Sequence, residues 1–143
     1  MQDLLVKPHD RDAEGCVLSV TPQSAGWQHV GFSVFKLREG DGFERLLAER
    51  EACIVPLCGK VDVTAGSKSF EGIGGRASPF DGKPQAVYVP AGTAFSVTAA
   101  DPEVEVALCS APGRPGAHEA RLIAGDKIGF EERGQGSNRR LVS

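Results

Sequence analysis

The chain has 143 residues, of which 41% are hydrophobic and 24% are charged, and its formal net charge is −3. This is the length of one ordinary domain with a globular composition, and the mild negative charge argues against a general nucleic-acid binder. No apolar run approaches the roughly 20 residues of a membrane span, and the N-terminus has no signal-peptide pattern, so we expect no membrane partner and a cytoplasmic location.

Short apolar runs that end at turn residues follow one another along the chain, and helical periodicity is almost absent. The 18 glycines and 9 prolines fall at short intervals. We predict strands at residues 16–20, 30–37, 52–55, 60–64, 85–89, 95–99 and 103–108. Strands spaced by about ten residues, with turn signals between them, predict an all-β sandwich or barrel.

Three segments leave local alternatives open. Pro56 ends the run 52–55 and removes a backbone donor, which predicts a bulge or an edge strand. Residues 43–50 fit either a helical turn or an extension of the next strand. In the run 103–108, Glu103 and Glu105 share one face, and Val104 and Val106 share the other.

The C-terminal part reads differently from the rest. Residues 121–123 predict a short strand, 133–140 a polar basic turn, and 141–143 the start of another strand. Because a domain rarely ends where a strand begins, we expect a truncated or two-part protein.

The glycine-rich and cysteine-containing segments do not define a site. Residues 72–77 fit a degenerate G-x-G-x-x-A pattern, but the following Pro79 prevents a long helix, which favours a connection between strands. None of Cys16, Cys53, Cys58 and Cys109 forms a Cys-x-x-Cys pair. We expect these thiols to be reduced, buried and inert.

The histidines do not predict a metal site. His9, His29 and His118 are far apart in the sequence, whereas a transition-metal site usually takes two ligands from one local segment. We expect solvated imidazoles at His9 and His118, and a packing or hydrogen-bonding role at His29.

Five polar residues near or within strands are candidates for lining a substrate pocket. They are Arg50, Glu51, Arg76, Asp81 and Tyr88. The alternative for each is a surface or structural ion pair. The sequence assigns no catalytic residue.

Six segments together resemble one enzyme family. They are residues 26–32, 50–60, 72–80, 87–92, 109–113 and 133–138. In this order they resemble the N-terminal half of the 5-deoxy-glucuronate isomerases of myo-inositol catabolism, which are relatives of the 4-deoxy-uronate ketol-isomerases.

This resemblance implies a bicupin, two tandem cupin domains with a double-stranded β-helix or jelly-roll fold. It implies an aldose–ketose isomerisation of 5-deoxy-glucuronate to 5-dehydro-2-deoxy-gluconate, with the divalent metal held by a His-rich cluster in the second cupin. A metal-binding cupin has a His-x-His motif and a later Pro-x-Gly-x-x-His motif. Here residues 44–47 occupy the first region, and Phe95 follows Pro90-Ala91-Gly92 where the histidine would stand.

We therefore expect residues 1–132 to form an N-terminal cupin-like domain without metal ligands, and 133–143 to begin a linker to an absent second cupin. The expected partners are a small sugar acid, that second domain and, by analogy, further copies of the chain. One alternative is a non-enzymatic cupin-like module for sugar-acid binding or assembly. Another is a single metal-dependent cupin that uses His29, His118 and a carboxylate.

Overall fold

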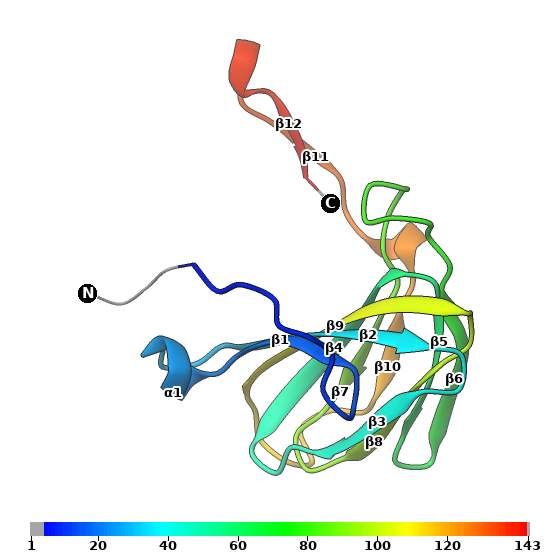
Figure 1. The fold of residues 1–143 in the computed structure, drawn as a ribbon. Helices are drawn as coiled ribbons and strands as arrows, with labels where there is room; N and C mark the ends of the chain where they lie inside the picture. The colour runs from blue at the N-terminus through cyan, green and yellow to red at the C-terminus, as the bar shows by residue number, and fades with distance from the viewer. Residues whose placement is uncertain (1–4, 143) are drawn as a thin grey trace.

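The computed structural model describes residues 5–142 and consists of two antiparallel β-sheets that face each other (Figure 1). The six-stranded sheet has the order β1-β2-β9-β4-β7-β10, with β1 at Cys16–Val20, β2 at Gly31–Arg38, β9 at Glu103–Pro112, β4 at Arg50–Cys58, β7 at Ala86–Val89 and β10 at Arg121–Ile123. The four-stranded sheet has the order β3-β8-β5-β6, with β3 at Gly42–Leu46, β8 at Ala94–Ala99, β5 at Lys60–Ala65 and β6 at Lys68–Gly74. The sandwich predicted from the sequence is confirmed.

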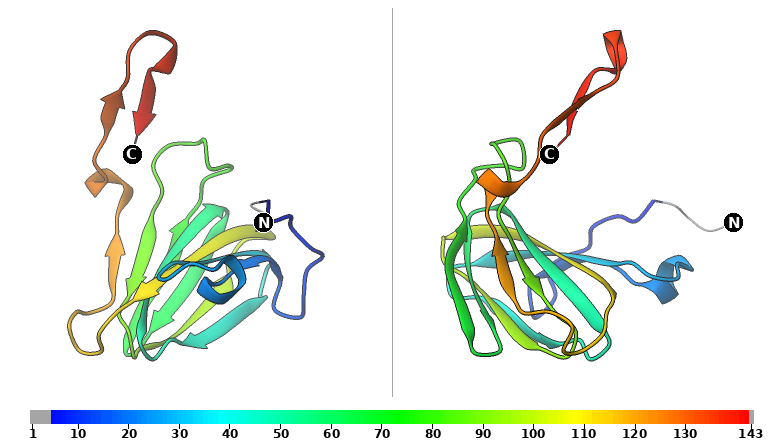
Figure 2. Two further views of the ribbon diagram at one scale, coloured as in Figure 1. Left: turned by 90° about the vertical axis from the view of Figure 1, so that its left-hand side faces the viewer. Right: turned by 180° about the vertical axis from the view of Figure 1, so that it is seen from behind.

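The remaining elements are short. Helix α1 covers Pro22–Ala25, and single 3₁₀ turns cover Gly125–Lys127 (η1) and Gly136–Asn138 (η2). Strands β11 (Glu131–Arg133) and β12 (Arg140–Val142) form a separate hairpin that stands away from the sandwich in each view (Figures 1 and 2). None of the helices within residues 5–142 is long and apolar enough to cross a membrane.

Alternation of polar and apolar side chains explains why these segments are strands. In β5, Lys60, Asp62 and Thr64 are exposed, while the intervening Val61 and Val63 are buried. A strand directs successive side chains to opposite faces, so this period-two pattern buries one face against the other sheet.

Two stacked aromatic rings lie in the core between the sheets. Phe35 of β2 and Phe43 of β3 come from different sheets, and their ring centroids are 3.9 Å apart at an interplanar angle of 15°. They are 1% and 4% exposed. This contact joins the two sheets through side chains that water does not reach.

Three local expectations need correction. Residues 43–46 are neither a helical turn nor an extension of β4, because Phe43 alternates with exposed Glu44 within β3 of the opposite sheet. Arg50 alone of the segment 43–50 extends the predicted strand, as the first residue of β4. Pro56 lies in an interior strand rather than at an edge, and the register shifts between Pro56 and Cys58, so the bulge alternative is correct. The Thr21-Pro22 turn is a short helix, with Thr21 capping the backbone N–H of Ser24.

Strand β6 was not predicted, because its glycines conceal it. Gly72 has φ +62° and its N–H donates to the Asp62 carboxylate at 2.8 Å. The register shift between Val61 and Val63 marks this as a bulge, which left-handed glycine accommodates without strain. The predicted connection at 72–77 therefore begins inside a strand and continues as a loop only after Gly74.

Substituting Phe43 by Ala should destabilise the fold strongly, because it empties the centre of the inter-sheet contact. We expect the free energy of unfolding to fall by about 3–5 kcal/mol in urea titration. Phe80→Ala is the matched control, since Phe80 is 94% exposed, and it should change stability by less than about 0.5 kcal/mol. Equal effects of the two substitutions would contradict this account of the core.

Candidate functional site

A cavity of about 260 Å³ opens between the two sheets, at the end of the sandwich where β2 begins and β9 ends. Its inward-facing lining residues come from both sheets: Arg45 from β3, Arg50 from β4, Ser33 from β2, and Leu108 and Ser110 from β9. The segment that follows β1 and contains α1 forms the rim. We call this cavity the sandwich mouth.

Arg50 points inward because it alternates with Glu51 along β4 and lies two residues before buried Ala52. Its Nη2 donates to the carbonyl oxygens of His29 at 2.6 Å and Ser110 at 3.1 Å. Its Nε lies 3.3 Å from the Ser110 hydroxyl oxygen, to which it donates. Neutral acceptors hold the guanidinium in place, so its positive charge is available at the mouth.

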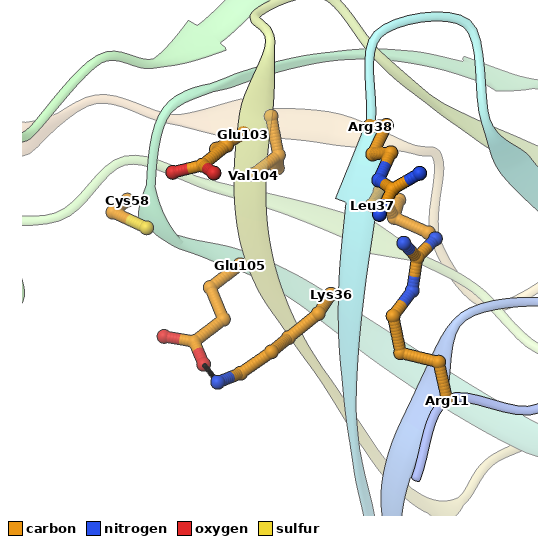
Figure 3. Close-up of a pocket in the computed structure, with 8 residues that line it drawn as sticks. All are labelled: Arg11, Lys36, Leu37, Arg38, Cys58, Glu103, Val104 and Glu105. Atoms are coloured by element: carbon orange, nitrogen blue, oxygen red, sulfur yellow. Dashed lines mark ion pairs between the residues drawn. The ribbon is translucent and has the colours of Figure 1, made fainter.

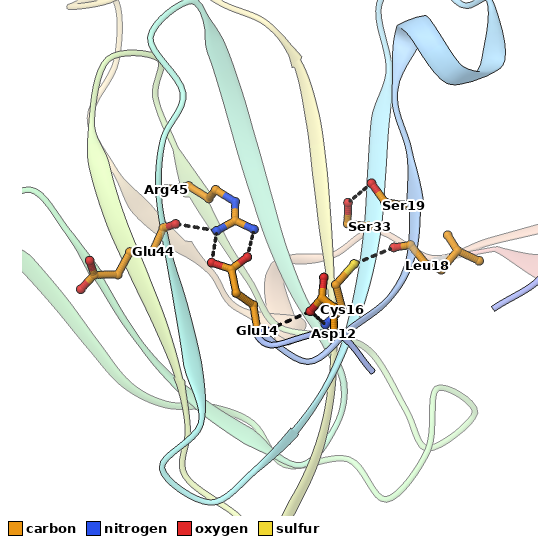
Figure 4. A network of polar contacts seen from close by, with 8 residues as sticks. All are labelled: Asp12, Glu14, Cys16, Leu18, Ser19, Ser33, Glu44 and Arg45. Carbon is orange, nitrogen blue, oxygen red and sulfur yellow. Dashed lines mark hydrogen bonds and ion pairs between the residues drawn. The ribbon is translucent and has the colours of Figure 1, made fainter. Parts of the chain in front are cut away.

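Arg45 brings a second guanidinium to the mouth from the opposite sheet. It lies 5.4 Å from the centroid of the Phe43 ring and 5.8 Å from that of Phe35. Its two terminal nitrogens donate to the two carboxylate oxygens of Glu14 at 3.0 and 2.7 Å (Figure 4). This bidentate pair lowers the pKa of Glu14 and raises that of Arg45.

The sandwich mouth can bind and orient an anion but cannot accept a proton. A guanidinium stays protonated at any pH a protein survives, and serine hydroxyls are weak bases. The described residues that line the mouth include no imidazole and no carboxylate. Chemistry that needs a general base must take that base from elsewhere.

The donor set of the mouth does not fit a metal ion. Divalent cations take imidazole, thiolate or carboxylate ligands, whereas the described lining offers guanidinium and hydroxyl groups, and the Arg50 guanidinium repels a cation. Across residues 5–142, no three His, Cys, Asp or Glu side chains are grouped closely enough to hold an ion. The alternative that pairs His29 and His118 with a carboxylate therefore finds no site in this part of the chain.

A second cavity, of about 390 Å³, lies at the opposite end of β2 and β9 (Figure 3). Its charged groups largely neutralise one another. Lys36 pairs with Glu105 at 3.3 Å, and Arg11 pairs with Asp41 at 2.7 Å. None of the five pocket candidates predicted from the sequence lines this cavity.

The structure separates the predicted pocket residues into three places. Arg76 lies in the loop after β6, where its guanidinium donates to the carbonyl oxygens of Pro56, Pro79 and Gly82 and so fastens that loop to β4. Asp81 is exposed in the same loop. Only Arg50 reaches the sandwich mouth.

Tyr88 and Glu51 form a pair on the outer face of the six-stranded sheet. The Tyr88 hydroxyl donates to the Glu51 carboxylate at 2.9 Å. Desolvation raises the pKa of Tyr88, and the hydrogen bond to Glu51 raises it further. The His118 ring meets the Tyr88 ring edge-on at 6.3 Å, so this imidazole packs on the sheet.

No disulfide joins the four cysteines, all of which lie within the described residues. Cys16 is buried as expected, whereas the other three are half-buried. Desolvation raises the pKa of Cys16, Cys53 and Cys109, which keeps these thiols protonated and poorly nucleophilic at neutral pH.

Sequence reasoning missed Arg45 and Ser110 as site residues. Because residues 43–50 fit either a helical turn or an extension of the next strand, the sequence did not define the direction of the Arg45 side chain. A signal was present, since Phe43 and Arg45 are two apart and therefore share one face of a strand.

Comparison with known proteins places the fold and the family. The chain shares 41% identity with a 5-deoxy-glucuronate isomerase of Geobacillus kaustophilus, over 99% of this chain and 51% of the relative. An IolB-like protein of Salmonella typhimurium superposes with a TM-score of 0.87 at 38% identity, over 97% of this chain and 52% of that one. The KduI/IolB family matches residues 4–143. The chain belongs to the KduI/IolB family.

The more distant neighbours of this KduI/IolB chain agree on the fold. A cupin domain from Schizosaccharomyces pombe superposes with a TM-score of 0.50 at 15% identity, over 77% of this chain and 69% of that one. The fold is therefore an all-β cupin-like sandwich, as the resemblance implied. The chain spans about half the length of the curated relatives it matches.

The Glu14–Arg45 ion pair makes the free energy of unfolding depend on pH in the acidic range. The pKa of Glu14 lies below its ordinary value of 4.5 in the folded chain, so ionised Glu14 stabilises the fold above that value, and the stabilisation is lost as pH falls through the folded pKa. Because the Glu14 side chain is 47% exposed, the gain is small, below about 1 kcal/mol.

We expect Glu14→Gln to lower the unfolding free energy at neutral pH and to reduce its decline on acidification. Urea titrations at neutral pH and at pH 3 would measure the difference. Glu71→Gln, at an exposed carboxylate of β6, should leave the pH profile unchanged. A Glu14→Gln profile parallel to that of the wild type would contradict the role of the pair.

Proposed function

We propose that this chain is the N-terminal cupin half of a 5-deoxy-glucuronate isomerase, and that the half alone does not catalyse the reaction. The full protein would convert 5-deoxy-glucuronate to 5-dehydro-2-deoxy-gluconate. The observation that carries this proposal is the family match over residues 4–143, with curated isomerases aligned over about half of their own length.

The chemistry of the reaction supports a division of labour between two halves. An aldose–ketose isomerisation moves a proton between adjacent carbons, which requires a general base and stabilisation of an enediolate. The sandwich mouth of this half offers guanidinium and hydroxyl groups but no base. In this proposal the base and a divalent metal belong to the other half, because the cationic donor set here does not suit a metal.

Arg50 is the predicted pocket residue whose position best supports contact with substrate. A guanidinium recognises a carboxylate through charge-assisted hydrogen bonds, and a sugar acid carries such a group. Arg50 is fixed by backbone and serine acceptors rather than by a carboxylate of this chain. Arg76, Asp81 and Tyr88 have less support, since Arg76 is bound to three carbonyl groups and Tyr88 to Glu51.

The domain boundary belongs to the same proposal. We place the cupin-like domain at residues 1–132 and a linker toward the other half at 133–143. The hairpin formed by β11 and β12 supports a boundary near this point, because it starts at Glu131 and leaves the sandwich rather than packing on either sheet (Figures 1 and 2). Its basic and acidic side chains pair within the hairpin, as Arg139 does with Glu132.

The isolated chain should show no isomerase activity on 5-deoxy-glucuronate, with or without an added divalent metal. Mixing or co-expressing it with the uncovered half of the Geobacillus kaustophilus isomerase should give turnover. Product formation would be followed by NMR, with the uncovered half alone as control. Turnover by the isolated chain would overturn the proposal, and so would full activity of the other half alone.

Arg50→Gln should raise the KM of the reconstituted enzyme by about 10-fold or more, because one charge-assisted carboxylate contact is lost. Arg50→Lys should restore part of the loss through its charge. Arg139→Gln, in the exposed hairpin, is the control and should leave KM unchanged. An unchanged KM in Arg50→Gln would remove Arg50 from the substrate site.

A binding module without catalysis is the second candidate, and the absence of a base among the lining residues of the sandwich mouth favours it. Calorimetry with 5-deoxy-glucuronate separates the two. Binding by the isolated chain together with an inactive reconstituted protein would establish the module, whereas turnover on reconstitution establishes the enzyme half.

A further inference from the structure

The outer faces of the two sheets differ in chemistry. On the four-stranded sheet the outward side chains are mostly polar, as with Glu44, Asp62 and Thr64, with Leu46 an exposed apolar side chain among them. This is ordinary for an antiparallel sheet with one face in water. On the six-stranded sheet the outward positions in the middle of the inner strands are apolar, and charged residues occupy the outward positions toward the strand ends.

The strand register arranges these apolar side chains in two adjacent rows across the six-stranded sheet. Directly opposed residues of an antiparallel pair share one face, so the pairings define each row. The first row follows the pairings Val20↔Phe32, Phe32↔Cys109, Cys53↔Cys109 and Cys53↔Tyr88.

The second row lies beside the first and is also apolar. It consists of Leu18, Val34, Ala107 and Val55, in the order of their strands. All of these residues alternate with core residues, so they point away from the other sheet. Val20 and Ala107 are buried yet do not belong to the core cluster between the sheets. We call the two rows together the apolar face.

Charged side chains border the apolar face. Beyond the second row, the pair Lys36–Glu105 projects from β2 and β9 on the same side (Figure 3). Beyond the first row stands Glu51, which accepts a hydrogen bond from Tyr88. An apolar centre inside a polar rim is the anatomy of a protein interface.

Within residues 5–142, margins of the apolar face have neighbours outside the sheet, and Val20 and Phe32 line the sandwich mouth together with the segment that contains α1. The N-terminal segment lies at one corner, where His9 shares a cavity with Leu18 and Val34. His118 contacts Tyr88 near the opposite edge. At the centre, Cys53, Val55 and Cys109 keep part of their surface accessible.

The sequence of the central strands agrees with burial on both faces. β4 contains the run Ala52 to Val55, and β9 the run Val104 to Cys109 interrupted only by Glu105. Continuous apolar runs of this kind are typical of strands covered on both sides, whereas β5 alternates strictly. The chain is therefore built to be covered on this face.

We propose that the apolar face is the docking surface for the other half of the family protein. The inference rests on the proposed function. The curated relatives contain about as much chain again as this chain covers, so in those relatives a second segment of similar length is joined to the part that matches this chain. Two sheets that pack face to face bury rows of just this apolar, small-to-medium kind.

The test measures association of the 143-residue chain with the uncovered half of the Geobacillus kaustophilus isomerase, by calorimetry and by light scattering after gel filtration. Val55→Glu, at the centre of the face, should weaken association by about 30-fold or more. Val34→Glu on β2, in the same row of the face, should act alike. Thr64→Glu, the same type of change on the outer face of the four-stranded sheet, should leave the affinity unchanged.

Circular dichroism melting of each isolated variant checks that it folds, and the Val34 variant serves if the Val55 variant does not. Failure of the wild-type halves to associate would overturn the proposal, as would equal affinities of the Val55 and Thr64 variants. A homodimer of the isolated chain that Val55→Glu dissolves and the other half does not displace would assign the face to a second copy instead.

An assay of isomerase turnover separates the docking proposal from the proposed isomerase function on which it rests. Association that Val55→Glu weakens, without turnover, would leave the docking surface standing and remove the isomerase function. Turnover that is unaffected by Val55→Glu would preserve the function and place the contact elsewhere.

Discussion

The stacked rings of Phe35 and Phe43 hold the two sheets together, and the sandwich mouth is lined by residues of both sheets. Each ring belongs to a different sheet, and both are almost completely buried. The guanidinium of Arg45 lies near both rings, at distances typical of cation–π attraction. The hydrophobic core therefore holds one of the two charged groups at the sandwich mouth.

The sandwich mouth takes its polar groups from both sheets of the cupin-like fold. Inward-facing positions at one end of the sheets are occupied by Arg45 and Arg50. Arg45 is paired with Glu14, whereas neutral acceptors hold Arg50, so the Arg50 charge favours an anionic ligand and disfavours a cation. A fold with a closed apolar interior thus presents a cationic side chain at one end.

Both faces of the six-stranded sheet carry apolar side chains. Its inner face closes the core through Phe35, Ile54 and Val106, which are at most 1% exposed. Its outer face carries the apolar rows, bordered by Lys36–Glu105 and Glu51. The described outer face of the four-stranded sheet is mostly polar, so the outer faces of the two sheets differ in the contacts they can make.

The sequence by itself determined the strands with period-two alternation, such as β5 and β8, because alternation is a local property. It also showed that no histidine pair exists, and its resemblance named the family that the comparisons then confirmed. It placed Arg50 among the pocket candidates. It missed β6, where a bulge at Gly72 breaks the alternation, and it misread β3, whose partner strand β8 is distant in the sequence.

Only the tertiary structure decided which side chains meet. Arg45 and Arg50 are five positions apart yet belong to different sheets. They share a cavity because the chain crosses from one sheet to the other between β3 and β4. The apolar rows join Leu18, Val55 and Ala107 through strand register, which long-range backbone hydrogen bonds set. Local pattern fixes the direction of a side chain relative to its own strand, but register and sheet order determine its neighbours.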